Sequence, residues 1–241
     1  MAELSGMYGS LMGTDFAAVG RLLSSPARAA MLEVLLDGGT ASASDLAASA
    51  SVKRSTASGH LAALVDAQIL DVSVRGRHRD YRLANRDVAL ALEALSRICP
   101  DRPVHSLKTG RTMDVMRVAR TCYDHLAGTL GVEILDAMLE REWLVPRDDG
   151  YAVAESGERM LIAIGVDVDD ARRQRRTFAR PCIDWTERRP HLAGALGAAL
   201  CRSVLAAGWA CRRRGDRGLL VTALGATQLN ETFGIALVVE R

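Results

Sequence analysis

Aromatic residues, paired cysteines and long apolar runs are all scarce in this sequence. Aromatics form only 4% of the 241 residues, which argues against single-strand binding by base stacking on exposed rings. No apolar run approaches the roughly 20 residues that a membrane-spanning helix requires. The first twenty residues also lack the basic start and apolar core of a signal peptide. We therefore expect a cytoplasmic protein with no membrane partner.

The cysteines do not form a recognisable disulfide pattern. They are five in number, which is odd, and they are widely spaced with no Cys-x-x-Cys pair. A disulfide framework usually needs an even number at short spacings. Some of the cysteines are therefore candidates for working thiols. Their positions are Cys99, Cys122, Cys182, Cys201 and Cys211.

Basic residues concentrate in one segment, from Ser51 to Arg86. This segment has seven basic and three acidic residues, a net charge of +4, whereas the whole chain carries only +2. The rest of the chain is consequently net acidic. A positive field confined to one segment is typical of a surface that binds nucleic acid.

Hydrophobic spacing predicts a helix-turn-helix around the start of this segment. Two short helices are expected within Phe16–Leu36, broken near Pro26. Ser44 can cap a third helix over residues 45–50, and a fourth follows over about 54–67. The fourth helix has an apolar stripe at Ala57, Leu61, Leu64 and Val65, and its other side bears Arg54, Ser55, Ser58 and Gly59. Short side chains on that side would let the helix approach base edges closely.

A β-hairpin rich in arginine is expected directly after the fourth helix. Residues 70–74 alternate like a strand, residues 75–79 form the turn, and residues 81–83 return. An amphipathic helix over residues 86–98 follows, with apolar positions at Leu90, Leu92, Leu95 and Ile98. Base edges would be contacted by the helix and phosphates by the hairpin. The candidate DNA-binding residues are Lys53, Arg54, Ser55, Thr56, Ser58, His60, Arg75, Arg77, His78, Arg79 and Arg82.

Residues 16–98 resemble the winged helix-turn-helix regulators of the ArsR/SmtB family. The resemblance rests on Ser25-Pro-Ala-Arg28, on Ser55-Thr-Ala-Ser58 followed by His60-Leu61, and on the stretch from Arg75 to Leu83. It implies a homodimer formed by the first and the post-wing helices, and a repressor that an effector releases from its operator. Metal-sensing members carry ligands in the third or the post-wing helix, and this sequence lacks both sets. Gln68 also stands where a glycine is usual.

The remainder of the chain contains an internal repeat. His125-Leu-Ala-Gly-Thr-Leu-Gly131 returns as His191-Leu-Ala-Gly-Ala-Leu-Gly197, an offset of 66 residues, and Trp143 returns as Trp209. Each copy is expected to run helix, helix, short hairpin, helix. The fold class expected is mainly α with short β-hairpins (α+β), with an N-terminal winged helix and two winged-helix-like repeats. The expected divisions are 1–99 for DNA binding and dimerisation, 100–111 as linker, and 112–241 as effector or scaffold domain, with repeats at about 112–170 and 178–241.

Cysteine and histidine residues in these repeats suggest a metal site. Cys122 and His125 are expected at i and i+3 on one helix face, and Cys182, Asp184 and His191 cluster around the matching helix. Two thiolates and two imidazoles suit a divalent metal such as zinc. In the repeat register, however, Cys122 corresponds to Arg188. The alternative is that the histidine motif is a packing motif and the cysteines are buried apolar fillers.

An organic effector is the other kind of ligand that the repeats suggest. Tyr123 and Trp185, with the two histidines, would line a pocket between the repeats, and Arg188 or Arg189 would anchor an anion. We favour this slightly over metal or thiol sensing. The basic run at residues 172–176 is interpreted as a solvated helix face.

The function expected is that of a sequence-specific regulator of transcription that binds double-stranded DNA. An effector bound at or through the C-terminal domain would release a homodimeric repressor, and a metal or redox sensor there is the alternative. A fused enzyme using Cys122 and His125 is a remote alternative, because no glycine-rich phosphate loop, nucleophile elbow or zinc-protease pattern is present. The sequence does not distinguish a repressor from an activator.

Overall fold

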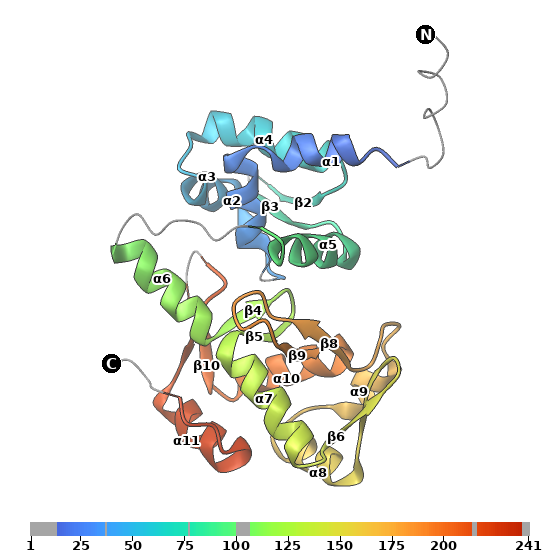
Figure 1. Ribbon diagram of the computed structural model, residues 1–241. Helices are drawn as coiled ribbons and strands as arrows, with labels where there is room; N and C mark the ends of the chain where they lie inside the picture. Colours follow the sequence, from blue (N-terminus) through green and yellow to red (C-terminus); the bar gives the residue numbers. More distant parts are fainter. Residues whose placement is uncertain (1–13, 37, 77, 100–106, 214–215, 238–241) are drawn as a thin grey trace, which may run out of the picture.

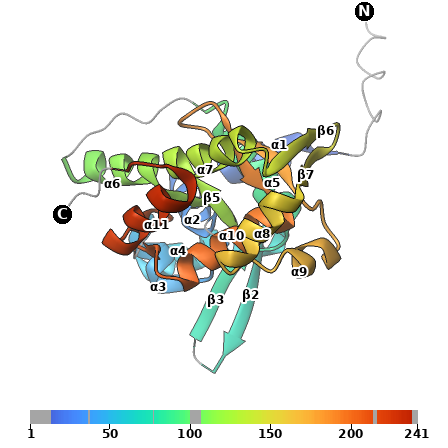
Figure 2. The same cartoon turned by 90° about the horizontal axis from the view of Figure 1, so that it is seen from below.

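The N-terminal part of the protein is a winged helix (Figure 1). The computed structural model describes residues 14–36, 38–76, 78–99, 107–213 and 216–237. The N-terminal elements are α1 (Phe16–Leu23), α2 (Pro26–Leu35), β1 (Ala41–Ser42), α3 (Ala43–Ser49), α4 (Arg54–Asp66), β2 (Leu70–Arg75), β3 (His78–Leu83) and α5 (Arg86–Ser96). β2 and β3 pair antiparallel and project from the body as a hairpin in Figure 2. The expected winged helix-turn-helix is therefore present.

Local sequence explains where these helices begin. Ser25 caps α2 by accepting a hydrogen bond from the Arg28 amide, and Pro26 occupies the first turn, where its missing N–H is not needed. The cap of α3 is Ser42 rather than Ser44, so this helix starts earlier than the sequence suggested. Residues 41–42 before it pair with β3 and add a third strand to the wing sheet. A two-residue strand carries no periodicity, so it could not be predicted from the sequence.

The helix-turn-helix has its own hydrophobic core. Ala57, Leu61 and Leu64 of α4 are fully buried in it, as the predicted stripe requires, while Val65 is half-buried. On α5 the buried residues are Ala89 and Glu93. The apolar face expected on this helix is therefore buried only in part, because the C-terminal end of the helix is exposed to solvent.

The C-terminal part contains four hairpins and six helices in its described residues. They are α6 (Leu107–Val118), β4 (Arg120–Cys122), β5 (His125–Ala127), α7 (Gly128–Glu140), β6 (Leu144–Arg147), β7 (Gly150–Val153), α8 (Glu155–Ala163), α9 (Val168–Arg173), β8 (Arg180–Ile183), β9 (Pro190–Ala193), α10 (Gly194–Ala206), β10 (Ala210–Arg212), β11 (Leu219–Val221) and α11 (Ala223–Phe233). α6 covers the last five residues of the segment expected to be a linker, and residues 100–106 lie outside the described part of the chain.

The order of elements recurs, but it is not the order that the sequence suggested. Each half runs helix, hairpin, long helix, hairpin, helix, with α7 and α10 as the long helices. The expected order of helix, helix, hairpin, helix is wrong at its second position, where a hairpin of three- or four-residue strands stands. Across the halves, α7 packs on β9 and α10 packs on β5, around a second hydrophobic core. The overall prediction of a mainly helical chain with short hairpins is confirmed.

Candidate functional site

The candidate DNA-binding surface consists of the outer side of α4 and the wing. Arg54, Ser55, Thr56, Ser58 and Gly59 are all exposed, and Lys53 precedes the helix at its N-cap position. On the wing, Arg75, His78, Arg79 and Arg82 are exposed as well. Arg77 lies outside the described residues. Small and cationic side chains thus share one accessible surface, as a groove-binding helix with a phosphate-binding wing requires.

Three of the predicted DNA-binding side chains make contacts within the protein. The Ser58 hydroxyl donates to the Arg54 carbonyl oxygen at 3.0 Å. His60 is half-buried, and its Nδ1 lies 3.5 Å from Nη1 of Arg28 on α2. Arg82 forms an exposed ion pair with Asp71 across the hairpin at 3.0 Å. A screened surface pair of this kind is weak, so Arg82 can exchange its partner for a phosphate, whereas His60 faces the helix bundle.

The second candidate site lies where hairpins β4–β5 and β8–β9 meet. Cys122 and His125 are directly opposite each other on one hairpin, and Cys182 and His191 are directly opposite each other on the other. The expectation that Cys122 and His125 share a helix face is therefore wrong. The prediction failed because the apolar run after His125 suggested a helix that includes this residue, whereas the helix begins only at Gly128.

The two hairpins place their cysteines at equivalent positions. Two residues separate Cys122 from His125, but eight separate Cys182 from His191. The second hairpin loop is thus six residues longer, which shifts the offset between the cysteines to 60 while that between the histidines stays at 66. Cys182, and not Arg188, is the structural counterpart of Cys122.

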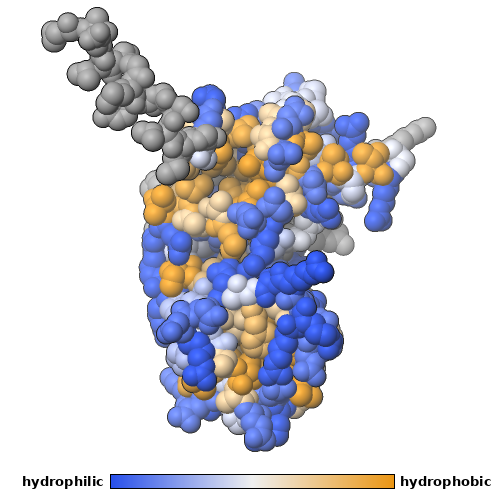
Figure 3. Space-filling model, turned by 90° about the vertical axis from the view of Figure 1, so that its right-hand side faces the viewer, coloured by the Kyte–Doolittle hydropathy of each residue, from blue (hydrophilic) through white to orange (hydrophobic). Residues whose placement is uncertain are grey.

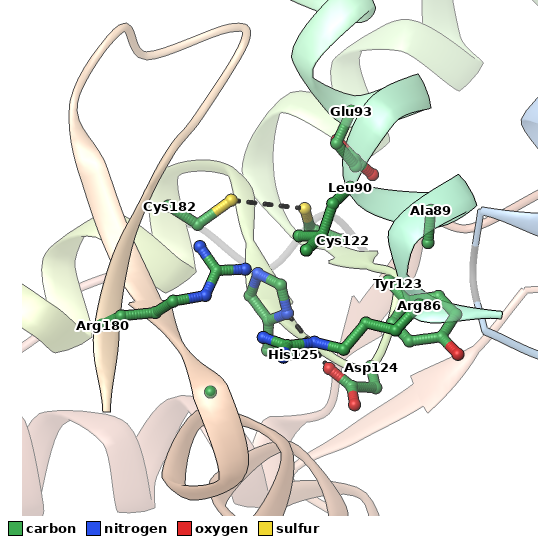
Figure 4. A pocket seen from close by; sticks show the side chains of 11 residues that line it. Arg86, Ala89, Leu90, Glu93, Cys122, Tyr123, Asp124, His125, Arg180 and Cys182 are labelled. Carbon is green, nitrogen blue, oxygen red and sulfur yellow. Dashed lines mark hydrogen bonds and ion pairs between the residues drawn. The ribbon is translucent and has the colours of Figure 1, made fainter. Parts of the chain in front are cut away.

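The four side chains converge. One ligand atom from each of Cys122, His125, Cys182 and His191 lies within 4.8 Å of the other three. The two Sγ atoms are 3.9 Å apart, and the two imidazole rings are 5.0 Å apart between centroids. Figure 4 shows the sulfur atoms directed at each other, with His125 beside them. We refer to these four residues as the Cys/His cluster.

Small residues allow this close approach. A Cβ at Gly131 would lie 3.4 Å from the Cβ of His191, and one at Gly197 would lie 3.3 Å from the Cβ of His125. Both would also collide with a backbone carbonyl oxygen. The glycine that ends each repeated motif therefore makes room for the histidine of the other motif. The packing interpretation of the motif and its use as a ligand-bearing segment are compatible.

A carboxylate stands behind each histidine. Oδ1 of Asp124 lies 3.3 Å from Nδ1 of His125, and Oδ2 of Asp184 lies 3.5 Å from Nδ1 of His191. Each aspartate follows its cysteine by two residues, so a Cys-x-Asp pattern occurs twice. Asp184 was predicted as a possible ligand and Asp124 was not, although this recurrence would have revealed both.

Arginines hold both carboxylates in place. Nη2 of Arg120 donates to both oxygens of Asp184 at 2.7 Å, in a fully buried pair, and the Gly128 amide donates to the same carboxylate at 2.7 Å. Burial alone would raise the pKa of Asp184, but Arg120 and these hydrogen bonds outweigh it and hold that pKa well below its usual range. Arg176 donates to Asp124 at 2.5 Å. Arg176 therefore does not belong to a solvated helix face, as its basic run suggested.

The pKa values of the two thiols are shifted in opposite directions. The Cys122 thiol, followed by the imidazoles of His125 and His191, lowers the pKa of Cys182 well below that of a free thiol. The interaction with Cys182 and the burial of the Cys122 side chain raise the pKa of Cys122. The two Sγ atoms lie 3.9 Å apart, within hydrogen-bond distance, and either can be the donor. Burial lowers the pKa of His125, but Asp124 and Cys182 outweigh this and raise it.

The residues proposed for an organic pocket are divided between two places. Tyr123 and His125 border a small cavity of about 10 Å³ beside the Cys/His cluster. Trp185 instead borders a more open surface cavity of about 290 Å³, together with Arg117 and Arg188. Its ring also stacks with the Arg120 guanidinium at 4.9 Å. The cluster itself is buried, because Cys122, His125 and His191 are each 3% exposed or less.

The cluster touches the winged helix. The small cavity is also lined by Ala89, Leu90 and Glu93 of α5, and Figure 4 shows Leu90 and Glu93 close to Cys122. The amide of Tyr123, in the turn between Cys122 and His125, donates to the Leu36 carbonyl at 2.7 Å. The ligand-bearing hairpin and the DNA-binding part are therefore in direct contact.

A buried ion pair makes a second link. Nη1 of Arg217, in the loop between β10 and β11, donates to Oε1 of Glu93 at 2.7 Å, and the two side chains are 7% and 10% exposed. The carbonyl of Arg217 accepts a hydrogen bond from the amide of Thr121 on β4. Arg217 thus joins α5 to the hairpin that carries Cys122.

Comparison with known proteins agrees with the winged helix. Residues 23–73 match a helix-turn-helix domain model. An HTH-type transcriptional regulator of unknown role from Bacillus subtilis (strain 168), YdfF, is 40% identical over 226 residues, which cover 94% of this chain and all of that protein. The chain belongs to the HTH-type transcriptional regulators. This family membership extends over the C-terminal part as well as the winged helix.

Solved structures cover the N-terminal third. The cadmium metal-sensor CMTR from Mycobacterium tuberculosis is 33% identical over 38% of this chain and 98% of its own, with a TM-score of 0.30. NolR from Sinorhizobium fredii is 23% identical over 34% of this chain and 81% of its own, with a TM-score of 0.31. Among the described residues of this regulator, none forms a helix long and apolar enough to cross a membrane.

Proposed function

We propose that this regulator is a homodimeric repressor that reads a double-stranded operator through α4 and the β2–β3 wing. The observation that carries the proposal is that the small side chains on the outer side of α4 and the arginines of the wing are exposed, and that the wing projects from the body (Figure 2). Two recognition helices about 34 Å apart would enter successive major grooves. Arg75 and Arg79 would bind phosphates.

Exposed apolar side chains on α1 and α5 support the homodimer. Phe16 is 81% exposed and Ile98 is 80% exposed, and Val19 and Leu95 are exposed as well. Figure 3 shows apolar patches on the winged-helix part of the molecule. Burying such side chains contributes about 25 cal/mol per Å². In the proposal a second copy of the chain covers them, as the resemblance to ArsR/SmtB regulators implies.

Residues 1–99 would form the DNA-binding and dimerisation domain, and residues 112–241 the domain that receives the effector. Two contacts support this division. The Tyr123–Leu36 hydrogen bond reaches the helix bundle, and the Glu93–Arg217 ion pair reaches α5, which is part of the proposed dimer interface. A hundredfold change in operator affinity needs only about 2.7 kcal/mol of coupling. A modest shift of α5 is sufficient for this.

A metal ion is the effector that the geometry favours over an organic ligand. The cavity beside the Cys/His cluster has about 10 Å³, roughly the room of one water molecule. A drug-sized molecule needs a few hundred cubic ångströms. An organic effector would instead have to bind in the open cavity beside Trp185.

Operator binding by wing variants tests the proposed DNA surface. A duplex selected from a random library by the full-length protein serves as the operator. Arg79→Ala should weaken binding to every duplex and reduce the slope of log affinity against log salt by about 0.9 for each phosphate that the variant no longer neutralises. Arg159→Ala, an exposed arginine on α8, is the matched control and should change neither quantity. Unchanged binding by Arg79→Ala would contradict the wing assignment.

A further inference from the structure

The spacing within the Cys/His cluster matches a tetrahedral metal shell. With a Zn–S bond of about 2.3 Å and tetrahedral angles, two sulfurs bound to one zinc lie about 3.8 Å apart. The Sγ atoms of Cys122 and Cys182 are 3.9 Å apart, and no two of the four ligand atoms are farther apart than 4.8 Å. Side-chain movements of about 1 Å or less would therefore complete the shell.

Both histidines present an unsatisfied nitrogen to the cluster. Nδ1 of His191 is buried without a hydrogen-bond partner among the described residues, and so are the two Nε2 atoms of His125 and His191. Buried polar atoms of this kind are rare, and each costs about 1–3 kcal/mol if it stays unpaired. A bound cation would satisfy both Nε2 atoms at once.

The carboxylate behind His125 favours the ligand form. Oδ1 of Asp124 lies 3.3 Å from Nδ1 of His125, which favours a proton on Nδ1 and a lone pair on Nε2. Oδ2 of Asp184, by contrast, lies 3.5 Å from Nδ1 of His191 and makes no hydrogen bond with it. This arrangement of carboxylate, histidine and metal is common in metal sites, where it orients the ring and raises its basicity. A carboxylate oxygen lies within 3.5 Å of a histidine Nδ1 in each half of the C-terminal part.

Charge and room also match a cation. A divalent ion bound by two thiolates has no net charge, so burial of the complete site carries no large penalty for an unpaired charge. The adjacent cavity is too small for an organic ligand. The ligands also lie on two hairpins that contact α5 and the end of α2. A bound ion would therefore act on the winged helix through these contacts.

We infer that Cys122, His125, Cys182 and His191 bind one thiophilic divalent cation of the zinc class in a closed tetrahedral shell. All four positions are filled by protein, which fits a structural or sensing site and leaves no position for a substrate. On binding, each remaining thiol proton is released to solvent, since thiolates are the ligands. The binding site stands independently of the proposed function, and its effect on the operator rests on that function.

Cobalt is the probe for the shell. The full-length protein is purified under reducing conditions, stripped with a chelator and titrated with Co²⁺ and then Zn²⁺. We expect one Co²⁺ per chain, a sulfur-to-metal charge-transfer band of two thiolates, the intense visible bands of tetrahedral Co²⁺, and displacement by Zn²⁺. An octahedral spectrum without the charge-transfer band, or no binding, would overturn the site.

Cysteine variants assign the ligands. Cys122→Ser and Cys182→Ser should each weaken Co²⁺ binding and reduce the charge-transfer band by half, while Cys211→Ser, an exposed cysteine outside the cluster, should leave both unchanged. Equal binding in all three would overturn the assignment. If the ligand variants fail to fold, the intensity of the charge-transfer band in the unaltered protein still reports how many thiolates bind Co²⁺. An intensity that corresponds to no thiolate would also overturn the assignment.

Operator binding by the same samples separates the two proposals. Metal-loaded and stripped protein should differ in operator affinity by tenfold or more. Tight metal binding with identical operator affinity would leave the site standing and refute its regulatory role. Metal binding by a protein that selects no duplex at all would refute the proposed function and leave the site intact.

Discussion

At the scale of single residues, the chemistry of the Cys/His cluster depends on side chains outside its four members. Asp124 and Asp184 lie beside Nδ1 of the two histidines, and Arg176 and Arg120 hold these carboxylates in turn. Removing such supporting groups typically costs a metal site 10- to 100-fold in affinity. A ligand set that looks complete at four residues is thus only half of the site.

Asp124→Asn should therefore weaken zinc binding without removing a ligand. The asparagine keeps the size of the side chain but loses the charge that favours a proton on Nδ1 of His125. We expect zinc affinity to fall by about 10- to 100-fold in a chelator competition assay, with the stoichiometry still one per chain. Asp148→Asn, at an exposed position in the β6–β7 turn, is the control. A variant that binds zinc as tightly as the unaltered protein would contradict the role of Asp124.

The remaining cysteines should differ in reactivity. Burial raises the pKa of Cys201 to about 11, so at pH 7.5 almost none of it is thiolate, the reactive form. Cys99 and Cys211 are exposed. Brief treatment with N-ethylmaleimide at pH 7.5, followed by peptide mass spectrometry, should show modified Cys99 and Cys211 and unmodified Cys201. Rapid labelling of Cys201 in the folded protein would show that its helix opens readily.

At the scale of elements, the winged helix was predictable and the ligand-bearing hairpins were not. The stripe Ala57, Leu61 and Leu64 and the arginine-rich hairpin are long enough to show their periods. The strands Arg120–Cys122 and His125–Ala127 have three residues each, too few to show alternation, and they run directly into the apolar helix α7. The sequence named these four residues as candidates and the structure brings them together, but their secondary structure was not predicted.

The unequal loops had a second effect on the prediction. A constant offset of 66 residues paired Cys122 with Arg188 and hid its true counterpart, because the six extra residues lie between Cys182 and His191. Insertions in hairpin loops are well tolerated, and they shift every position on one side of them. Aligning the Cys-x-Asp pattern independently of the histidine motif restores the correct pairing.

The close packing of α7 on β9 can be tested at Gly131. A Cβ there would lie 2.5 Å from the Leu126 carbonyl oxygen as well as against His191, so Gly131→Ala should lower the free energy of unfolding by about 1–3 kcal/mol. Gly20→Ala on α1 has nothing within 4 Å of the new methyl group and should stabilise its helix by about 0.5–1 kcal/mol. Urea unfolding measures both. An equally stable Gly131→Ala protein would show that the two halves are less tightly apposed.

Base reading by α4 is tested by a change in preference rather than in overall affinity. Ser55 is exposed on the outer side of the helix, where a hydroxyl can contact a base edge. Ser55→Ala should alter the preferred base at one position of each half-site, by about 1 kcal/mol, in a binding assay across single-base operator variants. A uniform fall in affinity across all variants would count against base contact by this residue.

At the scale of the whole molecule, two hydrophobic cores are connected by few but specific polar contacts. The Glu93–Arg217 pair is the buried one among them. Breaking such a pair leaves an uncompensated buried charge, which typically costs about 3–5 kcal/mol, whereas replacing both partners by apolar residues costs little. This contact therefore holds α5 against the loop between β10 and β11.

Single and double variants of this pair should behave very differently. Arg217→Leu should lower the free energy of unfolding by about 3–5 kcal/mol, and Glu93→Leu combined with Arg217→Leu should recover most of it. Glu155→Ala, in the exposed Glu155–Arg159 pair, is the control and should change it by no more than about 0.5 kcal/mol. Chemical denaturation of the four proteins provides the measurement. A double variant as unstable as the single one would mean that the ion pair is not the source of the destabilisation.

Each of the two hairpins supplies one sulfur and one imidazole, which is half of a coordination shell. Separate molecules with one hairpin each would have to meet before they could hold an ion, and their occupancy would rise and fall with protein concentration. Within one chain the second half is always present at a high effective concentration. Occupancy of such a site would depend on the concentration of the free ion and not on the concentration of the protein.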